Sequence, residues 1–187
     1  MKGKHLRSLL KVIPKNNIRY FLNGLYVNFN DRKIAATNGH ILVLLENLEE
    51  LNIDGTGEAI IPRNVIEAAT SVCDPNANVY ITNTELSIGD LTIKYKPING
   101  KYPDIRVVFP KKETSYENSR FCWFQSEYVK IVEKIGKDYV IDFKFFPPEN
   151  EKTSPLKLTG VSSDCSAFVT VFLCKLEVDI NGKKEHK

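Results

Sequence analysis

His40 is the residue whose type first suggests catalysis; it follows an Asn-Gly pair in an otherwise apolar stretch, residues 18–44. A catalytic histidine needs a nucleophile or an acid beside it. The other histidines, His5 and His186, lie at opposite ends of the chain, and no Gly-x-Ser-x-Gly or Cys-His signature accompanies His40. We interpret His40 as a corner residue between two strands, and we predict no catalytic residue and no enzymatic activity.

The sequence does not support metal binding or redox chemistry either. The four cysteines, at positions 73, 122, 165 and 174, lack Cys-x-x-Cys spacing, and acidic clusters with metal-ligand spacing and glycine-rich phosphate loops are missing. The start, MKGKHLRSLLKVIP, has spaced apolar residues and no small-residue cleavage site, so a secretion signal is not expected. We expect a cytoplasmic protein with reduced cysteines, no metal, no cofactor and no membrane span.

The distribution of charge points to a possible polyanionic partner. The 187 residues are 42% apolar and 26% charged, which is ordinary for a globular protein of one or two small domains. The net charge is only +3, but residues 1–15 contain five basic residues and no acidic residue. Such asymmetry can mark a surface that faces a polyanion, although a solvated helix face is the commoner meaning of one basic run.

Helical periodicity places these cations on one face. At about 100° per residue, the first predicted helix separates an apolar face from a basic one. The apolar face consists of Leu6, Leu9, Leu10 and Ile13. The opposite face carries Lys4, Arg7, Lys11 and Lys15.

Two further helices follow the same pattern. The second starts at Pro62, a good first-turn residue, with an outer face of Arg63, Glu67 and Thr70. Its inner face is predicted to be Val65, Ile66, Ala69, Val72 and Cys73. The third starts near Ser126, with Tyr128, Ile131, Val132 and Ile135 inward. Its outer row is Lys130, Lys134 and Lys137, which Glu127 and Glu133 flank.

The rest of the chain alternates like β-sheet, three strands after each helix. These strands are LYVNFN, KIAAT and HILVL, then NVYITN, ELSIGD and LTIKYKP, then DYVIDFKFF, LKLTGVS and AFVTVFLCKL. Turns are expected at Asn30-Asp31 and Asn38-Gly39, because both residues of an Asn-Gly pair tolerate a positive φ. The pattern predicts an α+β architecture.

A helix followed by three strands therefore occurs three times, over residues 1–54, 55–97 and 118–177. A leading strand precedes the second and third helices (GEAII and SRFCWF). The first copy begins almost at its helix, so its leading strand is missing or supplied elsewhere. One option is the segment LEVDI at 176–180.

Four ordered segments resemble the middle domain of the bacterial sliding clamp, the beta subunit of DNA polymerase III. They are IRYFLNGLYVNF, IAATNGHIL, AIIPRNVIEAA and NGKYPDIRVVFP. Residues 120–176 resemble the second half of that clamp's last domain. The resemblance implies the DNA-clamp fold with three βαβββ-type units, one complete clamp domain plus a half domain. The expected boundaries are a domain at 1–110, a connector at 111–117, a half domain at 118–180 and a tail at 181–187.

The resemblance is incomplete, because the clamp's first domain and the first half of its last domain have no counterpart. The head-to-tail dimer of the full clamp then cannot form, and a ring of twelve units would take four chains. A compact relative from a phage or mobile element is expected.

The resemblance implies a DNA polymerase processivity factor that encircles or contacts duplex DNA. It would assemble as a homo-oligomer, and it would bind a DNA polymerase, and a clamp loader, through short peptide motifs. Phosphate contacts would be independent of sequence. The residues expected to face DNA are Lys4, Arg7, Lys11, Lys15, Arg63, Lys130, Lys134 and Lys137. A solubilising surface is the alternative for such rows.

The resemblance also implies an apolar groove that accepts partner peptides. Its residues would be Leu22, Thr37, Gly39, His40, Ile41, Leu42, Pro103, Val107, Val108, Val171, Phe172, Leu173, Cys174, Lys175 and Leu176. Ile41 and Val107 stand where the family usually has arginine, Leu173 replaces a proline, and Phe172 is larger than usual. The alternative for these residues is ordinary core. The alternative function is a clamp mimic that never encircles DNA and regulates or inhibits a replication clamp or its partners.

Overall fold

The computed structural model describes residues 1–46, 52–108, 126–146, 156–161 and 166–171, with the backbone alone for Val108 and residues 166–171. Its helices are α1 (Gly3–Leu9), the 3-10 turn η1 (Tyr20–Leu22), α2 (Arg63–Val72), α3 (Ile105–Val108) and α4 (Ser126–Tyr139). The first strands are β1 (Gly24–Asn28), β2 (Lys33–Thr37), β3 (Ile41–Glu46), β4 (Asn52–Asp54) and β5 (Glu58–Pro62). The others are β6 (Val79–Thr82), β7 (Glu85–Ile88), β8 (Leu91–Lys94), β9 (Phe143–Phe146), β10 (Leu156–Val161) and β11 (Ser166–Val171).

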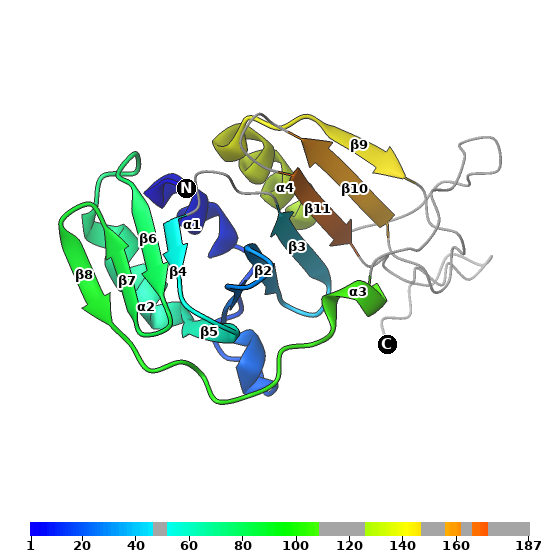
Figure 1. The fold of residues 1–187 in the computed structure, drawn as a ribbon. Coiled ribbons are helices and arrows are strands. Elements are labelled where there is room, and N and C mark those ends of the chain that lie inside the picture. Colours follow the sequence, from blue (N-terminus) through cyan, green and yellow to red (C-terminus); the bar gives the residue numbers. More distant parts are fainter. Residues whose placement is uncertain (47–51, 109–125, 147–155, 162–165, 172–187) are drawn as a thin grey trace, which may run out of the picture.

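A seven-stranded sheet joins the first and third predicted units (Figure 1). Its order is β5-β1-β2-β3-β11-β10-β9, and all of its neighbouring strands are antiparallel. The junction is the pair β3–β11, with Ile41 opposite Val171 and Glu46 opposite Ser166. The sheet therefore crosses the expected domain boundary, and the connector at 111–117 lies outside the described residues.

The strand GEAII corrects one expectation about the units. As β5 it pairs with β1 of the first unit, Gly24 opposite Pro62 and Asn28 opposite Glu58, and not with the strands of its own unit. In return, β4 from the end of the first unit pairs in parallel with β6 in a second sheet, ordered β4-β6-β7-β8. The edge of β1 is thus filled by β5. Residues 176–180, the option for the missing leading strand, lie outside the described residues. The strand predicted at 119–124 also lies outside them.

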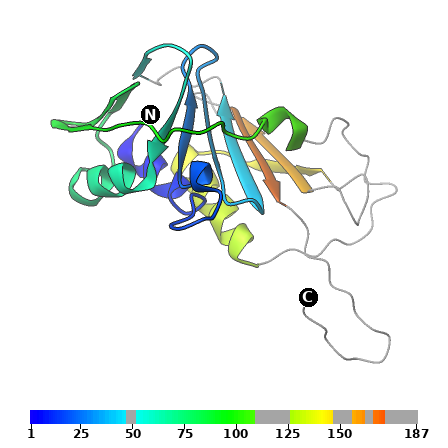
Figure 2. The same cartoon turned by 90° about the horizontal axis from the view of Figure 1, so that it is seen from below.

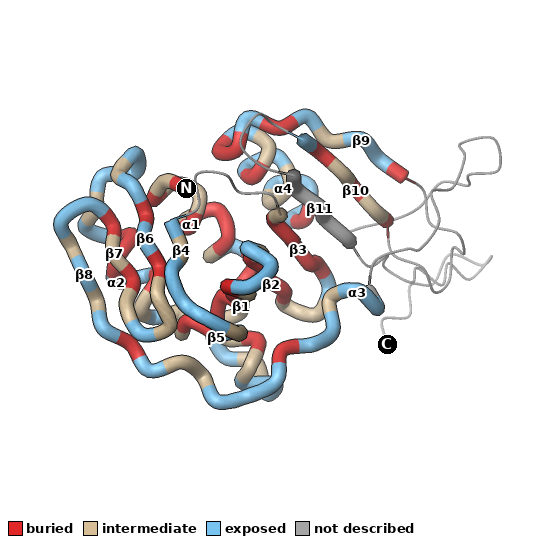
Figure 3. Tube along the Cα trace, viewed as in Figure 1, coloured by how far each residue is buried: buried red, intermediate tan, exposed pale blue. Residues whose placement is uncertain are grey.

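The helices α1, α2 and α4 lie together on one side of the molecule (Figure 2). The main core fills the space between them and the sheets, and its fully buried members include Leu6, Leu9, Leu25, Ile34, Ile41, Ile61 and Ile66. A smaller cluster covers the opposite face of the large sheet. It comprises Leu22, Tyr26, Ala35, Leu42, Leu44, Ile60 and Tyr102. Burial on both faces explains the nearly continuous apolar composition of β1 and β3, whose tubes are largely red in Figure 3.

Two details of the helices differ from the predictions. Regular α1 ends at Leu9, and Lys11 and Lys15 follow it in turns and bends, because Pro14 cannot continue a helix. On α2, Val72 is 75% exposed, whereas Thr70 is buried. Thr70 is tolerated in the interior because its hydroxyl donates to the Ile66 carbonyl oxygen (2.7 Å) and its own carbonyl oxygen accepts from Arg7.

The β2–β3 turn is shifted by one residue from the predicted one. The Asn38 N–H donates to the Ile41 carbonyl oxygen, so Gly39 and His40 are the central residues, and Gly39 takes a φ of 93°. The Asn38 side chain instead accepts the N–H groups of His40 and Ile41, at 2.9 and 3.0 Å. Asparagine serves here as the side-chain acceptor, and glycine supplies the positive φ.

Candidate functional site

The helical side carries a basic hollow of about 910 Å³, formed where α1, α2 and α4 meet. Its lining includes five basic side chains and two acidic ones, and the remaining lining is neutral. The basic residues are Lys4, Arg7, Lys11, Arg63 and Lys134. The acidic residues are Glu67 and Asp138. Five of the eight cations expected to face DNA are therefore gathered in one concave surface.

Arg7 contributes to the wall of the basic hollow by holding α2. Its Nε donates to the Thr70 carbonyl oxygen at 2.8 Å, and its Nη2 donates to the carbonyl oxygens of Thr70 and Cys73, the latter at 2.9 Å. These carbonyl oxygens lie at the C-terminal end of α2, where the helix itself supplies no N–H partner. A cation at this end also complements the helix dipole.

Arg63 makes the reciprocal contact from α2 to the segment after α1. Its Nη1 donates to the carbonyl oxygens of Leu10 (2.7 Å) and Ile13, and its Nη2 lies 2.7 Å from a carboxylate oxygen of Glu67. Its side chain is only 14% exposed. Arg63 therefore joins the two helical segments, a role that the row of outer-face residues on α2 did not suggest.

The lysines differ in how they are engaged. Lys134 pairs with Asp138 (2.8 Å) and Lys137 with Glu133 (2.6 Å), both one helical turn apart on α4. Lys11, Lys15 and Lys130 are exposed, and Lys15 lines a separate hollow next to Pro62. The structure thus brings Lys4, Lys11 and Lys134 to the basic hollow and sets Lys15, Lys130 and Lys137 outside its lining.

His5 joins α1 to the end of α4 and so connects the first and third units. Its Nδ1 accepts the Lys2 backbone N–H (3.1 Å), so its Nε2 carries the proton and donates to the Asp138 carbonyl oxygen (2.7 Å). Its ring stacks on Tyr139, with centroids 4.2 Å apart. Burial, helped by the Lys4 charge, lowers the pKa of His5 to about 4 from its ordinary value of 6.5.

The depressed pKa of His5 predicts a stability that falls in acid. Between about pH 6.5 and pH 4 the unfolded chain binds a proton at this ring and the folded chain does not, so the free energy of unfolding decreases as the pH falls through this window. The ring is partly exposed, so we expect a loss of about 1–2 kcal/mol. Urea denaturation at several pH values measures it. His5→Gln, which keeps a donor and an acceptor but does not titrate, should remove this part of the slope; an unchanged slope would contradict the assignment.

The residues expected to form the peptide groove are divided between the two faces of the large sheet. Leu22 and Leu42 belong to the smaller cluster, and Thr37 is buried beside them with its hydroxyl donating to the Ile41 carbonyl oxygen (2.8 Å). Ile41 is fully buried on the opposite, helix-facing side, because neighbouring residues of a strand point to opposite faces.

The remaining groove residues are exposed or partly buried, or lie outside the described part. His40 and Pro103 are exposed, Gly39 is partly buried, and Val107 is 79% exposed. The side chains of Val108 and Val171, and all of Phe172, Leu173, Cys174, Lys175 and Leu176, lie outside the described residues.

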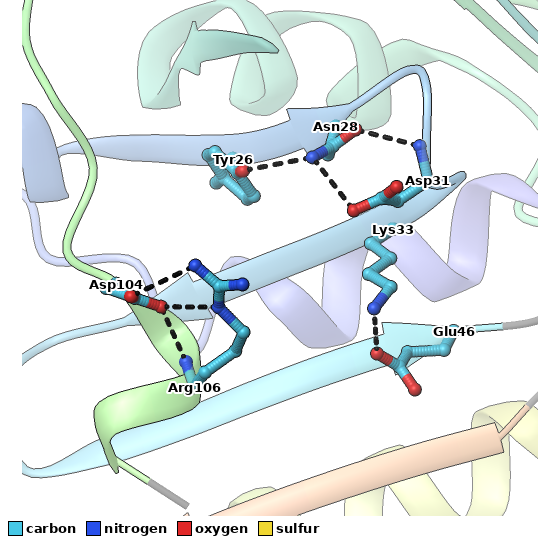
Figure 4. Close-up of polar contacts among 7 residues, drawn as sticks. All are labelled: Tyr26, Asn28, Asp31, Lys33, Glu46, Asp104 and Arg106. Carbon is cyan, nitrogen blue, oxygen red and sulfur yellow. Dashed lines mark hydrogen bonds and ion pairs between the residues drawn. The ribbon is translucent and has the colours of Figure 1, made fainter. Parts of the chain in front are cut away.

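Next to Pro103, a polar pocket of about 380 Å³ opens over β1, β2 and β3 (Figure 4). Lys33 and Glu46 form an ion pair at 2.7 Å on one side of it, and Asp104 and Arg106 form one at 3.1 Å on the other. At its floor the ring of Tyr26 stacks on the ring of Tyr102, with ring centroids 4.8 Å apart.

The surroundings of Tyr26 and Tyr102 raise the pKa of both side chains. Burial, together with the Glu58 carboxylate, raises the pKa of Tyr26 to about 12. Burial also raises the pKa of Tyr102, whose ring closes the pocket from the segment before α3. Our sequence reasoning did not single out either residue, although the alternation in LYVNF places Tyr26 on the face opposite Leu25 and Val27.

Comparison with known proteins relates part of this chain to bacterial clamps. No protein-family model matches the chain. A Beta sliding clamp of Pseudomonas putida is 31% identical over 122 residues, which are 59% of this chain and 33% of that protein. One from Caulobacter vibrioides is 25% identical over 136 residues, 66% of this chain and 35% of that protein. The chain thus spans about one third of the length of the curated relatives it matches.

Solved structures show the same fold. The DNA polymerase III subunit beta of Pseudomonas aeruginosa superposes with a TM-score of 0.63 at 18% identity, covering 94% of this chain and 66% of that one. The Helicobacter pylori beta clamp bound to a DNA ligase peptide superposes with a TM-score of 0.58 at 12% identity, covering 92% and 63%. The expected α+β clamp fold is confirmed. In the described part of the chain, no helix has the length and apolar character needed to span a membrane.

Proposed function

We propose that this chain, which has the beta-clamp fold and is similar in sequence to part of the bacterial Beta sliding clamps, is a DNA polymerase processivity factor. The observation that carries the proposal is the basic hollow, where five cations from three helices converge on one side of the molecule. Such a surface binds the phosphates of duplex DNA without reading bases. No catalytic group and no cofactor are needed for this activity.

The cations of the basic hollow have two roles in this proposal. Lys4, Lys11 and Lys134 contact phosphates. Arg7 and Arg63 hold the helices in place through backbone carbonyls, and they add positive charge to the wall. Because the sheets lie on the other side of these helices, several copies could enclose DNA with their helices inward and keep a polymerase on its template.

Binding to duplex DNA at increasing salt tests the proposal. We expect a linear fall of the logarithm of the binding constant with the logarithm of salt concentration, with a slope of about −0.9 for each phosphate contact. The triple variant Lys4→Ala, Lys11→Ala, Lys134→Ala should reduce the magnitude of that slope by up to about 3. Fluorescence anisotropy of a labelled duplex measures it.

A matched control removes the same charge elsewhere. Lys94, Lys96 and Lys101 are exposed and lie outside the lining of the basic hollow. Their replacement by alanine should leave the slope nearly unchanged, and equal slopes for the two triple variants would contradict the proposal.

DNA synthesis by a polymerase on a long primed template distinguishes a processivity factor from a clamp mimic. Stimulation of synthesis supports a processivity factor, and inhibition of clamp-dependent synthesis supports the clamp mimic.

We also propose that partner peptides bind at the rim of the smaller cluster, beside His40, Pro103 and Val107. A solved relative is bound to a DNA ligase peptide, which supports this kind of partner. Leu22 and Leu42 of the smaller cluster would lie beneath the bound segment, since apolar residues anchor a few side chains of an extended peptide. Ile41 is not included, because it lies on the other side of the sheet.

A further inference from the structure

The two halves of the large sheet have the same strand arrangement, but only one of them is covered on its outer side. From the β3–β11 pair outward, one half runs β3-β2-β1 and the other runs β11-β10-β9. Each half follows one helix in the sequence, α1 or α4. Because β3 and β11 are antiparallel, a local two-fold axis relates the first unit (α1, β1–β3) to the third unit (α4, β9–β11).

The outer flank of the first unit is covered. Strand β5 pairs along the whole of β1, from Gly24 to Asn28, and α2 packs beside α1. The two arginines described above fasten this contact from both sides. An edge strand and an apolar helix flank are thus both buried by the second unit.

The corresponding flank of the third unit is open among the described residues. Strand β9 is the last strand of the sheet, and α4 and β9 border a hollow of about 530 Å³. Apolar side chains are displayed there: Val129 is 48% exposed, Phe145 46% and Val140 78%. Val140 also has a φ of 56°, a conformation that is costly for a β-branched residue. Unpaired strand edges and exposed apolar patches are typical of interaction surfaces.

We propose that a second copy of this chain covers the flank, third unit against third unit, about a two-fold axis. In the described part of the chain β4, β5 and β8 also end a sheet, but the hollow with the exposed apolar side chains borders β9 and α4. Within the chain, β3 and β11 already form an antiparallel contact about such an axis. A head-to-tail contact would need a second, complementary apolar surface, whereas contact of this flank with its own copy needs only one surface and closes with two chains, so the two-fold arrangement is favoured.

The charges of the flank fit a self-complementary contact. Glu133 and Lys137 form an ion pair at 2.6 Å beside the exposed valines, and Asp142 lies in the same lining. Both signs are therefore present on each copy, and a two-fold arrangement can set Lys137 of one copy against a carboxylate of the other. The second copy would cover the edge of β9 and the flank of α4, as the second unit covers the edge of β1 and the flank of α1 within the chain. This surface is independent of the basic hollow, so it adds an assembly contact to the proposed function without resting on it.

Light scattering during size-exclusion chromatography tests the proposal on the full chain without DNA. From about 1 to about 100 µM, where interfaces of ordinary size assemble, we expect an even number of copies. The double variant Val129→Glu, Phe145→Glu buries two charges in the contact and should raise the dissociation constant at least about tenfold. Val72→Glu is the control, since Val72 is a valine on α2, away from this flank, that is 75% exposed, and the oligomeric mass of this variant should not change.

Amide hydrogen exchange of β9 gives a second measurement that does not depend on the variants. Protection of residues 143–146 should rise with protein concentration in the unmodified chain, whereas protection of β7 should not. A chain that stays monomeric at the highest concentration would overturn the proposal and indicate that residues 109–125 or 172–187 of the same chain cover the flank. An unchanged mass in the double variant, or an equal loss in Val72→Glu, would overturn it as well. The lysine triple variant should keep the oligomeric mass, which separates this result from a failure of DNA binding.

Discussion

Replacing Ile41 by alanine is expected to lower the free energy of unfolding by about 2–5 kcal/mol, the cost of a large-to-small change in a packed core. Ile41 is fully buried, and it belongs to the main core under the helices. Its strand, β3, forms the junction with β11, so a cavity here weakens the contact between the first and third units. Urea denaturation followed by circular dichroism measures the change.

The same variant decides between two roles for this position. The clamp resemblance places Ile41 in the peptide groove, where truncation would reduce peptide affinity and leave stability almost unchanged. The matched control is Val107→Ala, an apolar truncation at a 79% exposed position, which should change stability by less than about 0.5 kcal/mol. If Ile41→Ala were as stable as this control, the placement of Ile41 in the core would be wrong.

Gly24→Ala is expected to destabilise the protein by about 3 kcal/mol, because overpacking a close contact against backbone cannot be relieved by a side-chain rotation. Gly24 begins β1 opposite Pro62 of β5. A Cβ built at Gly24 would lie 2.5 Å from the Ile61 carbonyl oxygen and 2.7 Å from Cγ2 of Ile60. The added methyl would therefore force β5 away from β1, the pairing that interlocks the first two units.

Gly57→Asn provides the control for this glycine. Gly57 has a φ of 70°, and nothing lies within 4 Å of the position its Cβ would take. Asparagine tolerates the left-handed region better than other residues, so the loss should stay below about 1 kcal/mol. Thermal unfolding of both variants, with the fraction of β-sheet checked at low temperature, measures the difference. A larger loss at Gly57 than at Gly24 would show that the β1–β5 approach is not tight.

The sequence was sufficient for the type and order of most elements, but β4, α3 and η1 were not predicted, and Asp138 and Tyr139 belong to α4 and not to the strand expected at 138–146. The helix predicted near Ser126 begins there, and α2 begins at Arg63, one residue after the predicted Pro62, which is instead the last residue of β5; an apolar repeat of 3–4 residues is a local property. The four segments that resemble the sliding clamp also predicted the fold. The buried faces followed in outline, with errors where one helix packs on another: Thr70 is buried next to Arg7, and Val72 points to solvent.

The candidate site was predictable only in part. Periodicity gathered Lys4, Arg7 and Lys11 on one face, and the structure adds Lys134 from a helix more than 100 residues away in the chain. No local signal shows that Arg63 will meet the carbonyl oxygens of Leu10 and Ile13, since this contact depends on the relative position of two helices. Tyr26 was visible in the strand alternation, but its stacking on Tyr102 required the chain to return across the sheet.

By itself, then, the sequence determined which segments are helices or strands, which way most side chains face, and which family of folds they resemble. These follow from the period of apolar residues and from turn chemistry, which act over a few residues. The tertiary structure decided the partners: β5 on β1, β4 on β6, β11 on β3, and arginines on the carbonyls of the neighbouring helical segment. A strand's hydrogen-bonding edge accepts many partners with similar backbone geometry, so the choice among them depends on long-range packing of the whole core.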